Sequence, residues 1–321
     1  MSPSLQTVRA FNDSYKFASS PTSIPIAVFV GGTSGIGRAI AEAFAQHTRG
    51  NAKIILVGRK KAAADEIIAG FPKPSNKDLQ IEHEFVQCDA MLMKDIKRVT
   101  TDLVARLSKI NYLVLTVGIY SVSPRDPTPE GIDKMLAVHY YARWKFTFDL
   151  LPLLHKAKNQ QEDAKVFSLL ACGRSRPIDV DDFAMENGYT SLRAIGAGPT
   201  YNDLAFEEFA IRNPSITFFH AGPGIVLTNL ANNSPSPLLS FFAPVINVVM
   251  YPFSMSPAES GEHLLYGMLA HPNESGSKGS LETEGFFRIG SKGQDLKREG
   301  YIGGKMEREK LWEHTEKVVS V

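Results

Sequence analysis

The chain has 321 residues, of which 43% are hydrophobic and 21% are charged, so it can bury a sizeable core and its composition excludes a disordered chain. The formal net charge of +1 gives no electrostatic reason to expect nucleic acid or an acidic membrane as a partner. The two cysteines, Cys88 and Cys172, stand in unrelated contexts; this excludes a disulfide framework and a zinc-binding spacing, and it favours a reducing, cytoplasmic location.

Short apolar runs alternate with helical patterns along most of the chain. Residues 1–23 lack the apolar core of a secretory signal and are predicted to form an irregular arm. The predicted strands are Ile26–Val30, Lys53–Val57, Glu82–Gln87, Tyr112–Thr116, Ala164–Leu170 and Ser215–His220. The predicted helices are Gly37–His47, Lys60–Ala69, Met93–Ser108, Gly131–Leu154 and Tyr201–Ile211. This repeat is typical of an α/β fold, and it predicts one doubly wound parallel sheet with helices on both faces, over residues 24–321.

Three segments stand outside this alternation. Residues 171–199 are long and rich in Gly, Asp and Arg. Residues 228–253 are strongly apolar, but they are too short and too broken by Pro244 and Pro252 to predict a transmembrane segment. The tail, residues 284–321, is predicted to hold one more strand, Gly285–Ile289, and a charged helix, Lys305–Val318.

The junction of the first strand and the first helix carries the most specific motif. It reads Gly31-Gly32-Thr33-Ser34-Gly35-Ile36-Gly37-Arg38. A strand, a tight glycine turn and a helix N-terminus together present free backbone N–H groups and the positive end of the helix dipole to an anion. The glycines permit the turn, the close approach of a diphosphate and the packing of helix on strand, so the motif indicates a Rossmann-type dinucleotide site.

From about Ile26 to Ala270 the chain resembles the short-chain dehydrogenase/reductase family, and its details are similar to fungal reductases of specialised metabolism and to the retinol-dehydrogenase-like branch. Asp89 matches the family's acidic residue that contacts adenine, Gly118 ends the segment where the family has Asn-Asn-Ala-Gly, and Thr228 follows a Pro-Gly segment that borders the nicotinamide. The resemblance implies a cofactor site made of Gly31, Thr33, Ser34, Gly35, Ile36, Gly37, Arg38, Arg59, Lys60, Asp89, Ala90, Gly118, Pro223, Gly224, Val226 and Thr228.

The end of the second strand indicates which nicotinamide cofactor binds. NAD-binding proteins usually carry Asp or Glu there to hold the ribose hydroxyls, whereas this strand runs into Gly58-Arg59-Lys60. Because an arginine binds a phosphate through two parallel hydrogen bonds, we expect NADP(H), with Arg59 as the phosphate ligand and Lys60 or Arg38 assisting. The alternative is that these are solvated cations at a helix start.

The family's catalytic side chains are only partly matched. The resemblance implies a Tyr that donates a proton, a Lys one helical turn further on, a Ser that orients the carbonyl and an Asn that holds a water. The Asn position carries His139, which can relay a proton or pack as a polar helix residue. The Ser position carries Ala171, with Ser168 and Ser175 as the nearest hydroxyls.

Two tyrosines compete for the position of the proton donor. Tyr189 has Arg193 in the place of the Lys, and counting back from Pro223 favours it. Tyr201 instead begins a helix if that helix starts near Thr200, with a cap completed by Asp203, because Gly196 to Pro199 weakens a continuous helix. The predicted catalytic set is therefore Tyr189, Arg193, His139 and Tyr201, and no metal ligands are predicted.

Residues 228–255 lie where the family has its substrate lid. An apolar lid over a lipophilic small molecule is the first interpretation, with a peripheral membrane contact or an oligomer interface as alternatives. The resemblance also makes a homo-oligomer an expectation. The sequence thus predicts an NADP(H)-dependent reductase acting on a lipophilic carbonyl or imine. The alternatives are a non-redox isomerase or cyclase on the same scaffold, and an NADP(H)-binding protein without catalysis.

Overall fold

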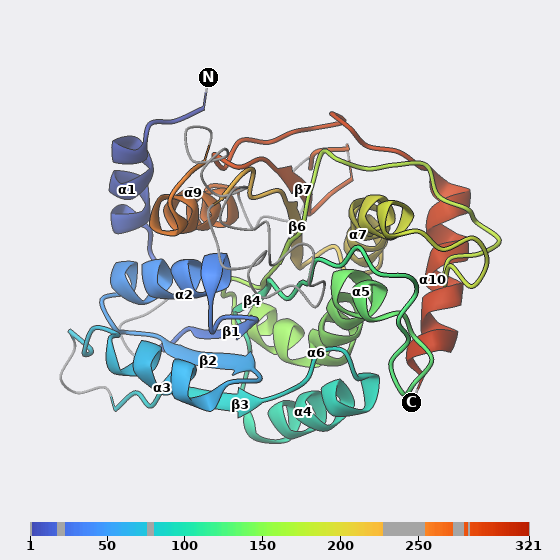
Figure 1. The fold of residues 1–321 in the computed structure, drawn as a ribbon. Helices are drawn as coiled ribbons and strands as arrows, with labels where there is room; N and C mark the ends of the chain where they lie inside the picture. Colours follow the sequence, from blue (N-terminus) through green and yellow to red (C-terminus); the bar gives the residue numbers. More distant parts are fainter. Residues whose placement is uncertain are drawn as a thin grey trace.

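A single parallel sheet organises the chain in the computed structural model, which describes residues 2–17, 23–75, 80–226, 254–271, 279–281 and 283–320 (Figure 1). Its strand order is β3-β2-β1-β4-β5-β6-β7. The strands are β1 (Ile26–Val30), β2 (Lys53–Gly58), β3 (Glu84–Gln87), β4 (Tyr112–Leu115), β5 (Lys165–Leu169), β6 (Thr217–Ala221) and β7 (Phe286–Ile289). The chain order reverses between β1 and β4, so the crevice where such folds bind ligands opens at the carboxyl ends of these two strands. The predicted fold class is confirmed.

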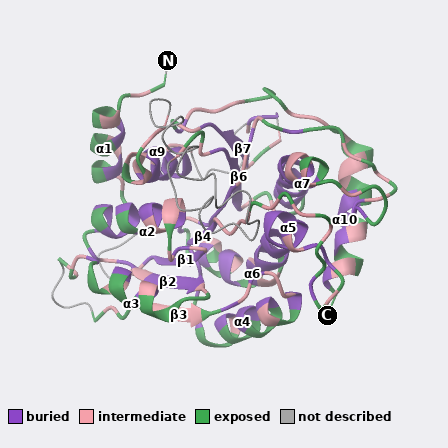
Figure 2. Ribbon diagram, in the orientation of Figure 1, coloured by how far each residue is buried: buried purple, intermediate pink, exposed green. Residues whose placement is uncertain are grey.

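Helices cover both faces of the sheet. Those described are α1 (Leu5–Ser14), α2 (Gly35–His47), α3 (Lys61–Ala69), α4 (Met93–Arg106), α5 (Lys134–Leu136), the π-helical turn η1 (Ala137–Tyr141), α6 (Ala142–Asn159), α7 (Ser191–Arg212), α9 (Pro257–Leu269) and α10 (Lys305–Val319). Val28 and Val30 of β1 face α4, α6 and α7, whereas Ala27 and Phe29 face α2, α3 and α9. Figure 2 shows the strands buried between these two layers. None of the described helices is long and apolar enough to cross a membrane.

The predicted irregular arm is wrong for residues 5–14, which form α1. Ser4 caps this helix by accepting a hydrogen bond from the Thr7 N–H. The buried Val8 and Asn12 face inward, and α1 lies beside α9 (Figure 1). Packing against α9, a contact that is distant in the sequence, therefore stabilises a helix that the local pattern did not indicate.

The predicted break at Gly196–Pro199 is also wrong. Helix α7 runs without interruption from Ser191 to Arg212 and contains Pro199. Thr190 caps it by accepting a hydrogen bond from the Arg193 N–H, so the helix begins ten residues before the predicted start at Tyr201. Asp203, expected to complete a cap, lies instead in the middle of the helix and is fully buried.

Candidate cofactor and active site

The glycine turn lies at the crevice between β1 and β4. Gly31 has φ +90°, and a Cβ there would lie 2.8 Å from Thr116 Oγ1 and 2.9 Å from the Val117 nitrogen. A Cβ on Gly37 would overlap Thr116 Oγ1 and the Gly31 carbonyl oxygen. Both glycines are thus needed for the turn to pack against the exit of β4.

The N-terminus of α2 is open to an anion. Its N-cap, Ser34, makes no side-chain capping hydrogen bond, and the first turn carries no acidic residue. The N–H groups of Gly35, Ile36 and Gly37 lie in that first turn, where a helix offers them no internal acceptor. By contrast, α9 begins with a complete capping box made by Ser256 and Glu259. The uncapped end of α2 therefore fits the diphosphate of a dinucleotide.

The predicted phosphate ligands differ in their ion pairs. Arg38 Nε lies 2.7 Å from Glu42 Oε1, and Arg38 Nη1 lies 3.4 Å from Glu66 Oε1, so its charge already has two carboxylate partners. Arg59 and Lys60 are exposed, and neither forms an ion pair with a described residue. Thr33 packs against Gly58, because a Cβ on that glycine would lie 3.1 Å from Thr33 Oγ1. Gly58 directly precedes Arg59, so this contact places the glycine turn beside Arg59.

The other predicted cofactor residues lie along the same edge of the sheet where they are described. Asp89 follows β3, and its Oδ1 accepts a hydrogen bond from the Met91 N–H at 3.0 Å, beside Ala90. Pro223 and Gly224 follow β6, and Gly224 has φ +69°. Val226 pairs with Met255 through an isolated parallel bridge. Thr228 and the predicted lid, apart from residues 254 and 255, lie outside the described residues.

The structure does not bring Tyr189 and Arg193 together as a proton-donating pair. The Tyr189 hydroxyl donates to Asp133 Oδ1 at 3.3 Å, and Asp133 is the N-cap of α5. Arg193 Nη1 donates to the carbonyls of Asn187 and Gly188 at 3.0 and 2.5 Å. Burial and the Asp133 charge raise the pKa of Tyr189, whereas the family's lysine would lower it.

Tyr201 does not point toward the crevice either. It is buried, and its hydroxyl donates to the Phe183 carbonyl at 3.1 Å. Its ring packs edge-on against Tyr140 and Phe183, with ring centroids 5.1 and 5.8 Å away. Burial raises its pKa as well. These contacts make Tyr201 part of the core.

The side of α7 that packs against His139 carries Gly198 and Asn202. A Cβ on Gly198 would lie 3.0 Å from Leu170 Cδ2 and 3.4 Å from His139 Cβ. Asn202 Nδ2 donates to the carbonyls of His139 and Gly198, both at 2.8 Å. This face of α7 therefore presents a glycine and a neutral amide to His139 and Ser168.

His139 lies in the π-helical turn beneath Gly118, where its Nε2 lies 3.6 Å from the position of a Gly118 Cβ. Burial, and then the charge of Arg143, lower the pKa of His139 to about 3. Its Nδ1 is buried and has no hydrogen-bond partner among the described residues. His139 is therefore a neutral imidazole, which excludes it as a cationic proton donor near neutral pH.

Both candidate serines donate to protein acceptors. The Ser168 hydroxyl donates to Asn202 Oδ1 at 2.8 Å and accepts from Arg143 Nη1 at 2.8 Å. The Ser175 hydroxyl donates to Asp203 Oδ2 at 2.8 Å. Both serine hydroxyl protons are therefore already donated within the protein and do not orient a substrate carbonyl. Ala171 has no hydroxyl.

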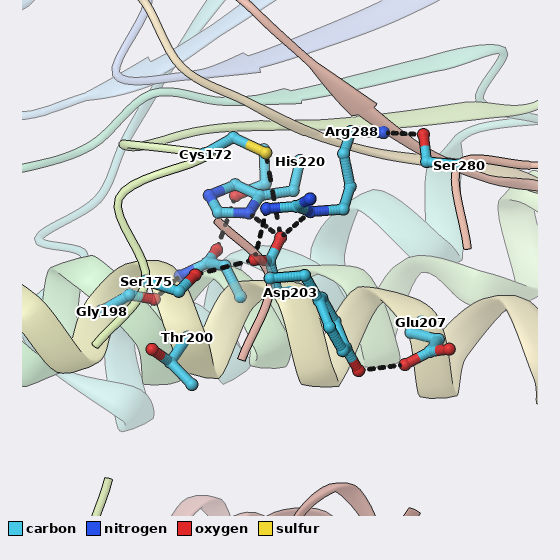
Figure 3. A network of polar contacts seen from close by, with 12 residues as sticks. Cys172, Ser175, Gly198, Thr200, Asp203, Glu207, His220, Ser280 and Arg288 are labelled. Atoms are coloured by element: carbon cyan, nitrogen blue, oxygen red, sulfur yellow. Dashed lines mark hydrogen bonds and ion pairs between the residues drawn. The ribbon is translucent and has the colours of Figure 1, made fainter. Parts of the chain in front are cut away.

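A second buried network surrounds Asp203 (Figure 3). Arg288 donates to the two carboxylate oxygens at 2.9 and 3.0 Å, and His220 Nδ1 lies 2.7 Å from Oδ1. Burial alone would raise the pKa of Asp203, but His220 and Arg288 together lower it, while burial lowers the pKa of His220. The network therefore holds an ionised Asp203 against a charged Arg288, with His220 neutral.

Cys172, Asp203 and His220 offer three ligand atoms within 4.8 Å of one another. Arg288 occupies both oxygens of Asp203, however, and its positive charge opposes a cation at this position. Burial raises the pKa of the Cys172 thiol, which also disfavours a thiolate ligand. This cluster fits an ion-pair core better than a metal centre.

Sequence comparison places the chain near known oxidoreductases. The short chain dehydrogenase family matches residues 25–162. An oxidoreductase of Emericella nidulans is 31% identical over 270 residues, which cover 84% of this chain and 78% of the relative. An oxidoreductase of Emericella variicolor is 31% identical over 299 residues, which cover 91% of this chain and 85% of the relative. The X-ray structure of an alcohol dehydrogenase from the archaeon Thermococcus sibiricus, complexed with 5-hydroxy-NADP, has a TM-score of 0.59 at 16% identity, covering 88% of this chain and 100% of that one.

Proposed function

Because this chain belongs to the short-chain dehydrogenase/reductase family, we propose that it is an NADP(H)-dependent reductase of a lipophilic carbonyl or imine. The family places it among oxidoreductases whose fold uses nicotinamide cofactors. The observation that carries the proposal is the uncapped N-terminus of α2, beside the exposed Arg59, which forms no ion pair within the part of the chain that the structure describes. The first would hold the diphosphate, and the second the phosphate that distinguishes NADP(H) from NAD(H).

Exposed apolar side chains near the crevice support a lipophilic substrate. Leu192, in the first turn of α7, is 82% exposed, and Val122 is also exposed. Ser191 Oγ donates to the Ser123 carbonyl at 2.9 Å, which holds the loop carrying Val122 against that first turn. Apolar side chains gathered at a surface favour an apolar ligand. The proposal extends to a substrate from specialised metabolism, for which the sequence resemblance to fungal reductases is the support, and to a cytoplasmic enzyme, for which the support is the absence of a disulfide pattern among the two cysteines.

The chemistry needs a proton donor other than the family's tyrosine. The cofactor, when bound, supplies a hydride to the carbonyl carbon, and the resulting alkoxide must take up one proton. Tyr120 lies two residues after Gly118, is 41% exposed and packs edge-on to His139, with ring centroids 6.3 Å apart. Burial raises its pKa, so the hydroxyl carries its proton at neutral pH. We assign this proton transfer to Tyr120.

Calorimetric titration of the protein with NADPH and with NADH tests the cofactor. The wild type should bind NADPH at least about tenfold more tightly. Arg59→Ala should weaken NADPH by about 10- to 100-fold, since a charge-assisted hydrogen bond contributes roughly 1.5–3 kcal/mol, and should leave NADH unchanged. Lys61→Ala is the matched control, because this neighbouring cation is already paired with Asp65 at 2.7 Å. Equal weakening of both cofactors would sink the phosphate role of Arg59.

A non-redox isomerase or cyclase is the second candidate, favoured by one observation. Tyr189 donates to Asp133 and Arg193 donates to the carbonyls of Asn187 and Gly188, so the structure does not bring the usual proton-donating pair together. Incubation with a panel of lipophilic aldehydes, ketones and imines separates the candidates. A reductase consumes NADPH absorbance in proportion to product, whereas an isomerase forms product with the cofactor omitted. Cofactor binding without any product would indicate an NADP(H)-binding protein without catalysis.

A further inference from the structure

Arg143, the second residue of α6, is a buried cation without a carboxylate partner among the described residues. It is 1% exposed. Its guanidinium donates to the carbonyls of Val138 at 3.1 Å, Leu115 at 2.9 Å and Val117, and to Ser168 Oγ at 2.8 Å. All of these acceptors are neutral, so they satisfy the hydrogen bonds of the guanidinium without cancelling its charge.

Lys165 is also buried and donates to the carbonyls of Met268 and His271, but it begins β5, at the edge of the sheet opposite the crevice. Two other buried cations have carboxylate partners. Arg288 is held against the carboxylate of Asp203, and Lys109 Nζ lies 2.5 Å from Glu162 Oε2. Burial lowers the pKa of Arg143 to about 9, which still leaves it protonated at neutral pH. Keeping an unpaired charge inside a protein is costly, and a methionine would fill the space without that cost. The presence of a charged side chain at a position that a neutral one would fill at lower cost therefore indicates that the charge has a role.

The position of Arg143 supplies one. Leu115 is the last residue of β4, and Val117 immediately precedes Gly118, so the guanidinium lies directly beneath the segment that is predicted to border the cofactor. Through Ser168 it also orients Asn202 of α7, because Ser168 Oγ accepts a hydrogen bond from Arg143 and donates one to Asn202 Oδ1. A positive charge is thus present at this end of the sheet, but it comes from α6 and not from α7.

We propose that Arg143 makes the site bind the reduced cofactor, NADPH, more tightly than NADP+; this rests on the proposed function. The oxidised nicotinamide ring carries a positive charge that the reduced ring lacks. A cation in a poorly screened interior repels the charged form and leaves the neutral form unaffected. NADPH and NADP+ carry the same phosphates. The ratio of their dissociation constants therefore depends on the electrostatic potential at the nicotinamide ring.

Calorimetric titration with NADPH and NADP+ tests this directly. The wild type should bind NADPH at least about tenfold more tightly than NADP+. Arg143→Gln keeps hydrogen-bond donors but removes the charge, and should reduce that ratio by roughly tenfold; Arg143→Lys keeps the charge and should retain most of the ratio. Arg59→Ala is the control, because both forms carry the same phosphate: it should weaken them equally and leave the ratio unchanged.

Two results would overturn the inference while the proposed function stands. One is a wild type that binds NADP+ as tightly as NADPH, which decides the matter even where Arg143→Gln does not fold. The other is a folded Arg143→Gln, with a wild-type circular dichroism spectrum, whose ratio is unchanged. Failure of the wild type to bind either form would overturn the proposed function together with this inference.

Discussion

At the scale of single residues, the tyrosines near the crevice differ in what their hydroxyls contact. Tyr189 donates to Asp133, and Tyr201 donates to the Phe183 carbonyl inside an aromatic cluster. Tyr120 lies on the loop that follows Gly118, and it is 41% exposed. A proton donor has to reach the substrate, so exposure at the crevice matters more than the presence of a cation four residues away.

Replacing each tyrosine by phenylalanine removes the hydroxyl and keeps the ring. Tyr120→Phe should lower turnover by about 10²- to 10⁴-fold, the usual contribution of general acid catalysis. Tyr189→Phe and Tyr201→Phe serve as matched controls and should retain wild-type turnover. The measurement is NADPH consumption with a substrate from the carbonyl and imine panel. Undiminished turnover in Tyr120→Phe, or a large loss in Tyr189→Phe, would contradict this assignment.

The sequence identifies the glycine turn but not the α7 residues that lie against His139. Gly31, Gly35 and Gly37 are recognisable because their spacing directly follows from the backbone geometry of the turn. Gly198 and Asn202 escape a search that starts from a tyrosine, because neither has a chemistry that marks it. Only the structure, in which α7 begins at Ser191, shows that these two positions lie against His139.

At the scale of elements, the strands are predicted well and the helix boundaries less well. β1 matches its prediction, and the other strands differ by one or two residues at their ends, because short apolar runs covered on both sides leave a clear pattern. Helix α7 was missed over its first ten residues because Gly196, Gly198 and Pro199 lower helix propensity locally. The packing of the buried face of α7 outweighs that propensity.

Three helices meet at His47, the last residue of α2. Its Nδ1 lies 2.8 Å from Asp13 Oδ1, and its Nε2 lies 2.9 Å from Glu262 Oε2 of α9. Asn12 of α1 also donates to Glu262 Oε2 at 3.0 Å. Burial opposes a charge on His47, but Glu262 and Asp13 together raise its pKa above the ordinary value. The same contacts lower the pKa of Glu262, although burial alone would raise it.

These shifts predict how stability depends on pH. The His47 contribution is complete below the unfolded pKa of about 6.5 and is lost as pH rises through its higher folded pKa. The Glu262 contribution is complete above about 4.3 and is lost as pH falls through its lower folded pKa. The free energy of unfolding from the His47–Glu262 pair should therefore be largest at about pH 5–6.

Urea unfolding of His47→Gln at pH 5.5 and at pH 8 measures this effect. The wild type should lose stability between these two pH values, and the variant should lose clearly less. His155→Gln is the control, because His155 contacts the neutral amide of Asn213, at 3.0 Å, and not a carboxylate. Equal slopes for the wild type and His47→Gln would show that the histidine is not charged in the folded state.

At the scale of the whole molecule, the Asp203 network joins parts that are far apart in the sequence. Asp203 belongs to α7, His220 to β6 and Arg288 to β7 (Figure 3). Arg288 Nη1 also donates to the carbonyls of Lys297 and Glu299 at 2.6 and 2.9 Å. The last strand and the segment leading to α10 are thus fixed to the centre of the fold by one guanidinium.

Arg288→Met should therefore destabilise the whole protein. It leaves the charge of Asp203 without its cation, and breaking a buried pair in this way costs about 3–5 kcal/mol. The exposed Arg298 offers the control, since Arg298→Met should change the free energy of unfolding by no more than about 0.5 kcal/mol. Both are measured by chemical denaturation. An Arg288→Met variant as stable as the control would mean that Asp203 becomes protonated at little cost.

The π-helical turn at Ala137–Tyr141 has a consequence for how such chains are compared. The turn holds one residue more than an α-helical turn would, and one helical residue corresponds to a rotation of about 100°. Deleting a single residue there would keep a helix but change which side chain lies beneath Gly118 and which lies beside Leu115. Two homologues whose sequences in this segment differ only by that one-residue insertion would therefore place different side chains beneath Gly118 and beside Leu115. For this part of the fold, the position of gaps in an alignment carries more information than percentage identity.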